Sequence, residues 1–388
     1  MIAHSTDDCV DEPVSLSQAD QDFHAELRRR VRTHFSTEPN GTAPGSVELF
    51  GTPSGRCLEF EALASRMRGT AAAHFKTATL FAWLVVSYAL LVFVADGPWT
   101  AVPFAVSLGL AMAGIGFNVM HDGGHGSYSQ SPRVNRLMAR SLDLLGGSSY
   151  VWHRKHNLLH HTWPNVAGLD DDIDTGGLAR MSVAQPRRGF HRFQWLYMWP
   201  LYGFLAVKWH FFDDFAFLAK CRVGSRRFPR PEGGDLAVFA GGKVLFFTWA
   251  FAIPLLWHPL PVVLGTYFVC VFVLGLTLST VFQLAHCVPE AASGLAGERS
   301  WARRQVESSV DFAPGHGLIT WYLGGLNYQI EHHLFPHIAH VHYPAIAPTV
   351  EAVCQEFGVR YSAYPTLRTA LAAHVRFLRR LGASPAAA

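Results

Sequence analysis

Four long apolar stretches constrain the fold of this 388-residue chain more than any other feature. They are residues 77–95, 99–120, 236–257 and 262–285, and Lys243 in the third is their only charged residue. A helix needs about 20 apolar residues to cross the hydrocarbon core of a bilayer. Helices buried in a soluble protein would normally keep a polar face, which these stretches lack. The sequence therefore predicts an all-α membrane protein with four transmembrane helices in two hairpins.

The overall composition agrees with a membrane protein. The chain is 49% hydrophobic and 16% charged, whereas soluble domains are about 25% charged. Its formal net charge of +3 is too small to indicate nucleic-acid binding. The six cysteines are scattered without a CxxC pair, so they predict neither a disulfide framework nor a zinc site.

Charge bias predicts the orientation of the spans. The turns at 96–100 and 258–261 contain no Lys or Arg, and positive residues favour the cytoplasmic side. Both termini and the long middle loop should therefore be cytoplasmic. Inside that loop, 195–212 is apolar and aromatic but interrupted by Pro200 and Lys208. Because Trp and Tyr prefer the head-group level, we interpret it as an interfacial helix.

The domain prediction has two parts. Residues 1–60 are interpreted as a polar cytoplasmic tail, partly disordered, in which 23–35 forms an amphipathic helix on the membrane or on the protein body. Residues 61–388 are predicted to form one domain, in which a cytoplasmic helical cap covers the ends of the spans.

Histidine, at 21 residues, is the compositional outlier. Histidines recur in HDGGH at 121–125, HNLLHH at 156–161 and QIEHH at 329–333, and His286 stands at the end of the fourth apolar stretch. With four spans, all of these positions reach the same membrane face. If 195–212 also crossed, the third motif would lie opposite the first.

Neutral imidazole is a common ligand of transition metals. One metal takes about four such ligands, so eight histidines indicate two metals. Breaking an unactivated C–H bond requires a metal that activates O2, as iron does. The pattern favours oxidative chemistry on a lipid at the membrane surface.

The three histidine motifs, in this order around two membrane hairpins, resemble those of the membrane fatty acid desaturase family. The resemblance covers about 60–375 and includes DLLGGSSYVWHRKHNLLHHTWPN, FQLAHC and YLGGLNYQIEHHLFP. Gln329 at the head of the third motif resembles the front-end branch, which desaturates between an existing double bond and the carboxyl end. Unlike many members of that branch, the sequence contains no His-Pro-Gly-Gly signature of a fused cytochrome b5 domain.

By this resemblance, the cap would hold two iron ions. The implied ligands are His121, His125, His156, His160, His161, His286, His332 and His333. Gln329 is a further candidate that would coordinate weakly, through water, or only orient its neighbours. His153 is a ninth histidine close to the second motif, and we interpret it as facing the interface or the substrate head group.

The resemblance also implies an activity: O2-dependent introduction of a cis double bond into a long-chain acyl substrate bound to CoA, a carrier protein or a lipid. Two electrons would come from a separate ferredoxin or cytochrome b5. Hydroxylation and acetylenation are alternatives that a similar site supports. A histidine-rich metal transporter is a remote alternative, and it would require ionisable residues along the spans.

Residues around the metal ligands form a second set of predictions. Six acidic residues are candidates to accept hydrogen bonds from ligating imidazoles, with Asp122 and Asp172 favoured: Asp122, Asp170, Asp171, Asp172, Asp174 and Glu331. Six arginines either dock an acidic electron donor or contact anionic lipid: Arg187, Arg188, Arg226, Arg227, Arg303 and Arg304.

Overall fold

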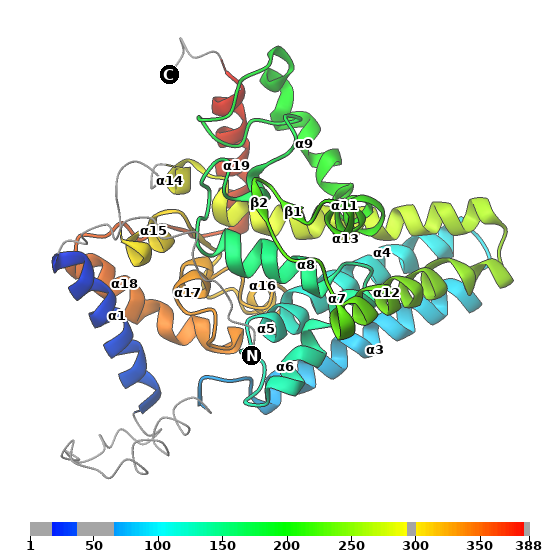
Figure 1. Cartoon of the computed structure of the whole chain (residues 1–388), viewed down its shortest axis with the longest axis horizontal. Coiled ribbons are helices and arrows are strands. Elements are labelled where there is room, and N and C mark those ends of the chain that lie inside the picture. The colour runs from blue at the N-terminus through cyan, green and yellow to red at the C-terminus, as the bar shows by residue number, and fades with distance from the viewer. Residues whose placement is uncertain (1–17, 37–65, 293–299, 384–388) are drawn as a thin grey trace, which may run out of the picture.

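The computed structural model describes residues 18–36, 66–292 and 300–383. Figure 1 shows long helices projecting to one side of the molecule and a cap of shorter helices gathered at their other end. The described strands form only two short pairs, β1 (Arg222–Val223) antiparallel to β2 (Arg226–Arg227) and β3 (Asp311–Phe312) parallel to β4 (Ala363–Tyr364). The predicted all-α class is thus confirmed.

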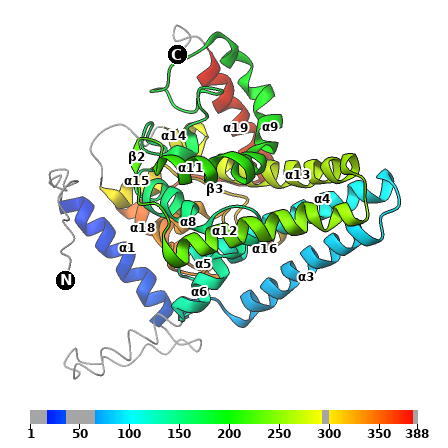
Figure 2. The same cartoon turned by 45° about the vertical axis from the view of Figure 1, so that its right-hand side comes forward.

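In the described part of the chain, four helices are long and apolar enough to cross a membrane. They span Ala71–Phe93 (α3), Pro98–Gly124 (α4, a π-helical turn and α5), Gly233–Leu256 (beginning with α12) and Leu260–His286 (α13). The helix α4 packs against both α3 and α13, and Figure 2 shows the same bundle from another direction. The chain is therefore a multi-pass membrane protein with the two predicted hairpins.

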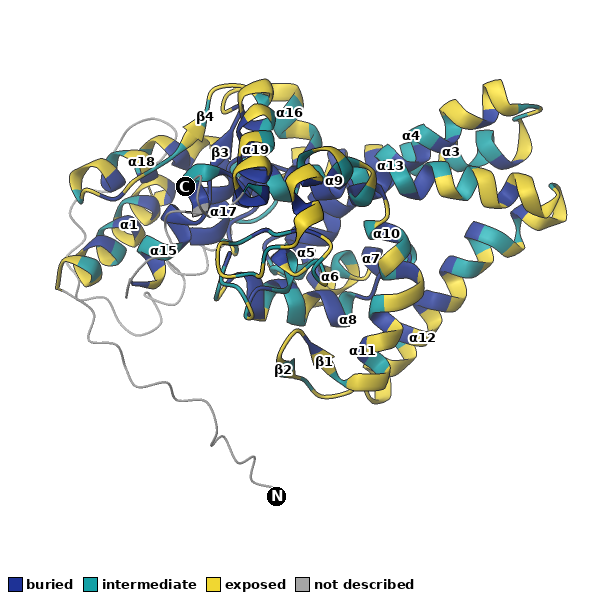
Figure 3. Cartoon of the chain, turned by 90° about the horizontal axis from the view of Figure 1, so that it is seen from above, coloured by how far each residue is buried: buried dark blue, intermediate teal, exposed yellow. Residues whose placement is uncertain are grey.

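Exposed apolar side chains mark the outer faces of these helices. Val85, Val86 and Phe268 are 60%, 55% and 44% exposed, and Figure 3 shows yellow faces along the projecting helices beside a buried centre. Water would not favour such surfaces, whereas lipid tails match them.

The first span begins at Ala71, earlier than the predicted residue 77. The charge of Lys76 argues against a span from sequence alone, but this lysine is only 5% exposed. Its Nζ lies 3.0 Å from His340 Nε2 in the cap. His340, whose ring contacts the buried Lys76 ammonium group, lies 264 residues away from it in sequence.

The segment 195–212 is not one continuous helix. It contains α9 (Gln194–Gly203), α10 (Leu205–Lys208) and the start of a π-helical turn. It is not among the helices suited to span a membrane, and α9 packs along α13 and α19. The exposed aromatic side chains of Phe204 and Phe212 face outward.

The cap is built from short helices. Its remaining members are α6 (Pro132–Ala139), α7 (Ser141–Leu144), α8 (Ser149–Trp152), α11 (Asp214–Lys220), α14 (Pro289–Ala292), α15 (Trp301–Glu307), α16 (Gly317–Tyr322), α17 (Gln329–Leu334), α18 (Tyr343–Glu356) and α19 (Leu367–Gly382). A hydrophobic cluster centred on α17 and α18 fixes the third histidine motif within this cap.

Within the described residues, one helix precedes the spans. The helix α1 (Gln18–Ser36) buries Phe23, Leu27, Val31 and Phe35 and lies against α18 and α15. The sequence predicted an amphipathic helix either on the membrane or on the protein body. In the structure this helix lies on the protein body. The rest of the predicted tail, 1–17 and 37–60, lies outside the described residues.

A buried ion pair joins the third span to the cap. Lys243 Nζ lies 2.6 Å from Asp214 Oδ2, with side chains only 7% and 6% exposed, and it also donates to the Gly146 carbonyl. Burial raises the pKa of Asp214 to about 6, while Lys243 opposes that shift.

We expect Lys243→Met to lower the free energy of unfolding by about 3–5 kcal/mol, because it leaves a buried carboxyl without its cation. Thermal unfolding of the detergent-solubilised protein measures this loss. Lys208→Met is the matched control: Lys208 is 57% exposed beside Asp213, and a surface pair contributes about 0–1 kcal/mol. Equal stability of the two variants would contradict the prediction.

Candidate metal centre

The structure brings all eight sequence-predicted histidines together at one end of the spans. His121 and His125 lie at the end of the second span. His156 and His160 belong to a π-helical segment at His153–His160, and His161 follows it directly. His286 ends α13. His332 and His333 are on α17 and are both fully buried. Four segments far apart in sequence thus meet in one buried cluster.

The local sequence explains how α17 reaches this cluster. Gly324 and Gly325 precede it with φ angles of 60° and 66°, a left-handed conformation that glycine adopts without strain. A Cβ atom on Gly324 would collide with the Phe117 carbonyl of the second span. The two glycines therefore permit a tight turn directly against that helix.

The imidazoles form two principal groups. One contains His121, His125, His156 and His332, and the other contains His160, His286 and His333. A further group joins His161 to His332 and His333, so His161 lies between the two. Within each group the possible ligand atoms lie within 4.8 Å of one another.

Several ring nitrogens of these histidines are buried without a hydrogen bond in the described part of the chain. They are the Nε2 atoms of His121, His125, His160 and His332, and Nδ1 of His161. Unpartnered buried polar atoms are rare, since each loses its hydration without compensation. Metal ions placed among these nitrogens would satisfy their lone pairs, so the donor set fits a pair of metals.

In four histidines of the cluster, the Nδ1 atom forms a hydrogen bond with another protein group. His160 Nδ1 donates to Asp170 Oδ2 at 3.0 Å and His286 Nδ1 to the Ser308 carbonyl at 3.1 Å. His332 Nδ1 lies 3.2 Å from the Tyr343 hydroxyl, and His333 Nδ1 lies 2.8 Å from Gln305 Oε1. Such bonds fix the ring orientation and the tautomer of a ligating histidine, here leaving each Nε2 toward the cluster.

The electrostatics favour neutral imidazoles in the cluster, with the exception of His160. Burial, followed by the neighbouring imidazoles, lowers the pKa of His125, His156, His161, His332 and His333 well below its usual value. Burial also disfavours a charged His160, but Asp170 outweighs it and raises the pKa of this residue. Neutral imidazole is the form that binds metal.

Gln329 lies within the second group. Its side chain is 2% exposed, and its amide Nε2 lies 3.0 Å from His286 Nε2. Rotation of the amide would present Oε1 to the same position, and the two orientations are assigned from the hydrogen-bond network. The geometry accommodates Gln329 either as a weak ligand or as a residue that orients His286.

Of the two predicted carboxylate partners, Asp172 lies near His160 and groups with His156 and His160, whereas Asp122 contacts a different histidine. Asp122 Oδ2 accepts a hydrogen bond at 2.7 Å from His340, which is outside the eight histidines. Asp172 Oδ2 lies 3.5 Å from His160 Nδ1, and Asp172 pairs with Lys155. The closer carboxylate is Asp170, which also accepts from the Asn165 backbone N–H.

Sequence reasoning included Asp170 among its candidates but favoured Asp172, and it missed Gln305. Asp170, Asp171 and Asp172 are adjacent and chemically identical, so the sequence holds no signal to choose among them. Gln305 accepts from His333 and donates to the His161 carbonyl, but it belongs to a short helix without a recognisable motif. His153 is exposed and lies 3.0 Å from the Asn157 side chain, and it is outside the histidine groups of the described chain.

The acidic residue inside QIEHH anchors α17 instead of contacting a histidine. Glu331 accepts a hydrogen bond from the Tyr361 hydroxyl, which also donates to Asp311. Burial, with Asp311 adding to it, raises the pKa of Glu331 well above its usual range, and burial raises the pKa of Asp311 to about 6. Burial therefore favours the protonated form of Glu331, and the Tyr361 hydroxyl lies between the two carboxyls beside α17.

A cavity of about 470 Å³ adjoins the histidine cluster. Its lining includes His156, Trp152 and Phe282, and its charged residues are Lys155, Lys208, Asp171, Asp172 and Asp174, of which Lys208 is exposed at the rim. A wall of apolar side chains with charged groups at the rim suits an amphipathic molecule.

A helical membrane protein with a buried histidine cluster that fits two metals, beside a largely apolar cavity, defines a class of integral-membrane metalloprotein. The family model described as fatty acid desaturase matches residues 97–365, more than half of the chain. The chain belongs to the fatty acid desaturase family, and it is an oxidoreductase.

Characterised relatives carry more specific names. The chain is 39% identical over 318 residues to an sn-1 linoleoyl-lipid 6-desaturase of Arthrospira platensis, covering 80% of this chain and 86% of the relative. A protein of the same name from Synechocystis is 36% identical over 80% of this chain and 88% of its own length. An acyl-lipid (8-3)-desaturase of Physcomitrium patens is 38% identical over 76% of this chain and 63% of its own.

Proposed function

We propose that this protein introduces a cis double bond into a long acyl chain of a membrane lipid, toward the carboxyl end of that chain. The observation that carries this proposal is the cluster of eight histidines in two groups beside a largely apolar cavity at the ends of the spans. The names of the two cyanobacterial relatives support a lipid-linked substrate and a position near the carboxyl end.

We further propose iron as the metal. His121, His125, His156 and His332 would hold one ion, His160, His286 and His333 the other, and His161 would stand between them, with Gln329 beside His286. Two bound irons would supply the O2 activation that acid–base side chains lack. The reaction balances when two hydrogens from the chain, two external electrons, two protons and O2 give a double bond and two waters.

The residues of the chain position the substrate. The apolar faces of Trp152 and Phe282 exclude water beside His156, and Lys208 at the rim stays exposed to meet a polar head group. A methylene offers no polar group for recognition, so the shape of the cavity decides which carbon pair lies beside the histidines.

Two electrons would come from a separate ferredoxin or cytochrome b5. Positive residues around the cap would dock such an acidic carrier or anionic lipid. Among the arginines predicted for this role, Arg303 pairs with Asp20, Arg304 stacks on Trp163, and Arg187 donates to the Gly382 carbonyl. We place the cap and both termini in the cytoplasm, because the turns without Lys or Arg lie at the other end of the spans.

Alternative chemistries make distinct predictions. A hydroxylase or acetylenase would use the same histidines and give an alcohol or a triple bond. A metal transporter requires a polar path along the spans, yet Lys76 and Lys243 there are bonded to neighbouring protein groups.

The test is expression in a host that lacks polyunsaturated lipids, with linoleic acid supplied. We expect a new cis double bond on the carboxyl side of the existing one, located by mass spectrometry of derivatised lipids. Intact glycerolipids should carry the product before the acyl-CoA pool does. A hydroxylated or acetylenic product, or a new bond on the methyl side, would contradict the proposal.

A further inference from the structure

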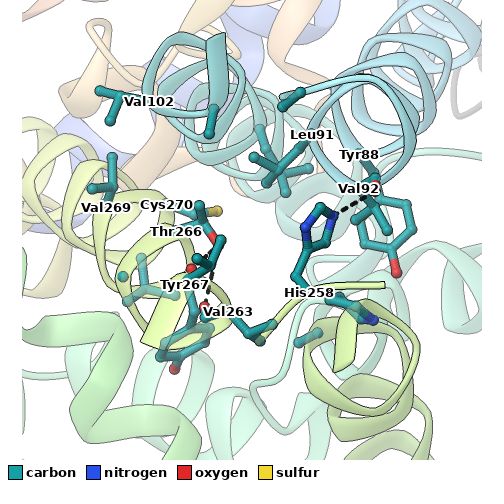
Figure 4. Close-up of a pocket in the computed structure, with 18 of the residues that line it drawn as sticks. Tyr88, Leu91, Val92, Val102, His258, Val263, Thr266, Tyr267, Val269 and Cys270 are labelled. Atoms are coloured by element: carbon teal, nitrogen blue, oxygen red, sulfur yellow. Dashed lines mark hydrogen bonds between the residues drawn. The ribbon is translucent and has the colours of Figure 1, made fainter. Parts of the chain in front are cut away.

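The first span is held at both of its ends. At the end nearer the turns between the spans, His258 Nε2 donates to the Val92 carbonyl at 2.7 Å, and Figure 4 shows this bond beside a cavity. At the other end, Lys76 Nζ lies 3.0 Å from His340 Nε2 in the cap. The second of these anchors joins the span to the part of the molecule that carries the histidine motifs.

Residues 67–76, here called the brace, connect the first and third histidine motifs. Arg68 Nη1 donates to the Gly126 carbonyl at 2.6 Å and to the His337 carbonyl at 2.7 Å. Gly126 directly follows HDGGH, and His337 lies shortly after QIEHH. Hydrogen bonds from a charged donor are about twice as strong as neutral ones, and here one nitrogen atom holds two backbone segments together.

Two further bonds hold the chain after the third motif. The Met67 carbonyl accepts from the Ala339 backbone N–H at 2.8 Å. The Arg68 carbonyl accepts from His342 Nε2 at 3.0 Å. The segment that follows the third motif is thus bonded to the brace through residues 337, 339 and 342.

A buried chain of three side chains completes the contact. Lys76 Nζ lies 3.0 Å from His340 Nε2, and His340 Nδ1 lies 2.7 Å from Asp122 Oδ2. With its proton on Nδ1, the neutral imidazole donates to the carboxylate and accepts from the ammonium group. The three side chains are only 5%, 3% and 1% exposed, so the lysine and the aspartate compensate each other's buried charge. Since Asp122 directly follows His121, Lys76 acts on the backbone that carries the first motif.

The brace joins the two motifs that supply three of the four histidines in the first group. These are His121 and His125 from the first motif and His332 from the third. Three protein groups outside the brace fix rings of the second group: Asp170, the Ser308 carbonyl and Gln305. Loss of the brace should therefore open the first group and leave the second in place.

We propose that Arg68 and Lys76 are positioning residues for the metal site of the first group. They hold the first motif against the third, so that His121, His125 and His332 converge on one site. This inference rests on the proposed two-metal centre. Without these bonds the first site loses its metal, while the second site keeps the partners that fix its histidines.

The experiment measures the iron content and the electron paramagnetic resonance spectrum of purified Lys76→Met. Methionine conserves the length of the side chain but leaves Asp122 buried without its cation. We expect iron per chain to fall from about two to about one, since each ligand group holds one ion. The remaining lone ferric ion should give a signal that a magnetically coupled pair does not. Product yield in cells should fall about 10–100-fold, as for other residues that support metal ligands.

Two control variants separate this effect from a general loosening of the spans. His258→Ala releases the opposite end of the same span. Lys243→Met removes another buried lysine, whose partner is Asp214. Both variants should keep both iron ions and show no signal of a lone ferric ion.

Arg68 provides a second, independent pair of variants. Arg68→Met removes both carbonyl bonds and should lose one iron, as Lys76→Met does. Lysine keeps a charged group with three donors, so Arg68→Lys should retain both irons and most of the activity. Size-exclusion elution reports folding, and if Lys76→Met does not fold, the Arg68 pair decides.

Retention of both irons in folded Lys76→Met or Arg68→Met would overturn the inference. Loss of iron without the signal of a lone ferric ion would mean that both sites empty together, and it would overturn the inference as well. A parent protein that binds fewer than two metal ions would refute the two-metal centre itself. A parent with both irons but no desaturation would refute only the proposed reaction.

Discussion

His332→Ala abolishes desaturation and removes bound metal. His332 belongs to the group with His121, His125 and His156 and also to the group with His161 and His333, so its loss opens both proposed sites. Changing a residue that only supports a ligand already reduces metal affinity or activity 10–100-fold. We expect a loss of more than about 100-fold for the ligand itself. Iron per purified chain, by elemental analysis, should fall with the activity.

The matched control is His337→Ala, five residues further along the same motif. His337 is exposed and outside the histidine groups of the described chain, so its replacement should leave iron content and product yield unchanged. Size-exclusion elution of both variants reports whether they are folded. A His332→Ala protein that keeps full iron content and activity would exclude the ligand assignment.

Asp170→Asn weakens the second group through His160. Asparagine keeps the shape but removes the negative charge, so the hydrogen bond from His160 Nδ1, 3.0 Å long in the parent, loses its charge assistance and holds the ring less firmly. Partners of this kind contribute about 10–100-fold to metal affinity or activity. Metal dissociation during chelator challenge and product yield in cells measure the two effects.

Asp172→Asn tests whether the effect is specific to Asp170 or follows from the combined negative charge of residues 170–172. Asp172 lies 3.5 Å from His160 Nδ1 and pairs with Lys155, so its replacement should change both readouts much less. A larger effect at Asp172 than at Asp170 would reverse the assignment and restore the partner expected from sequence.

Much of the architecture follows from local patterns. Hydropathy identified four spans because a spanning helix needs an apolar run that matches the bilayer thickness, whatever its tertiary contacts are. The start of α3 was the largest deviation, since the sequence shows the charge of Lys76 but not the His340 ring that receives it. Span parity similarly placed the four histidine positions on one face before any contact was known.

The identity of the supporting residues was decided by packing. Gln305 and Asp170 contact the histidine cluster only because α15 and the 170–172 turn fold against it. Asn165 donates to the carbonyls of His286 and Ser308, 121 and 143 residues away. Neither periodicity nor composition encodes contacts of such separation.

By itself, the sequence determined the class of fold, the family and the eight candidate ligands, because hydropathy and histidine spacing are short-range properties written along the chain. The tertiary structure alone decided how those histidines divide into two groups and that Asp170 and not Asp172 lies closest to His160. These outcomes depend on which helices meet and at what distance, and that is fixed by side-chain packing between elements remote in sequence.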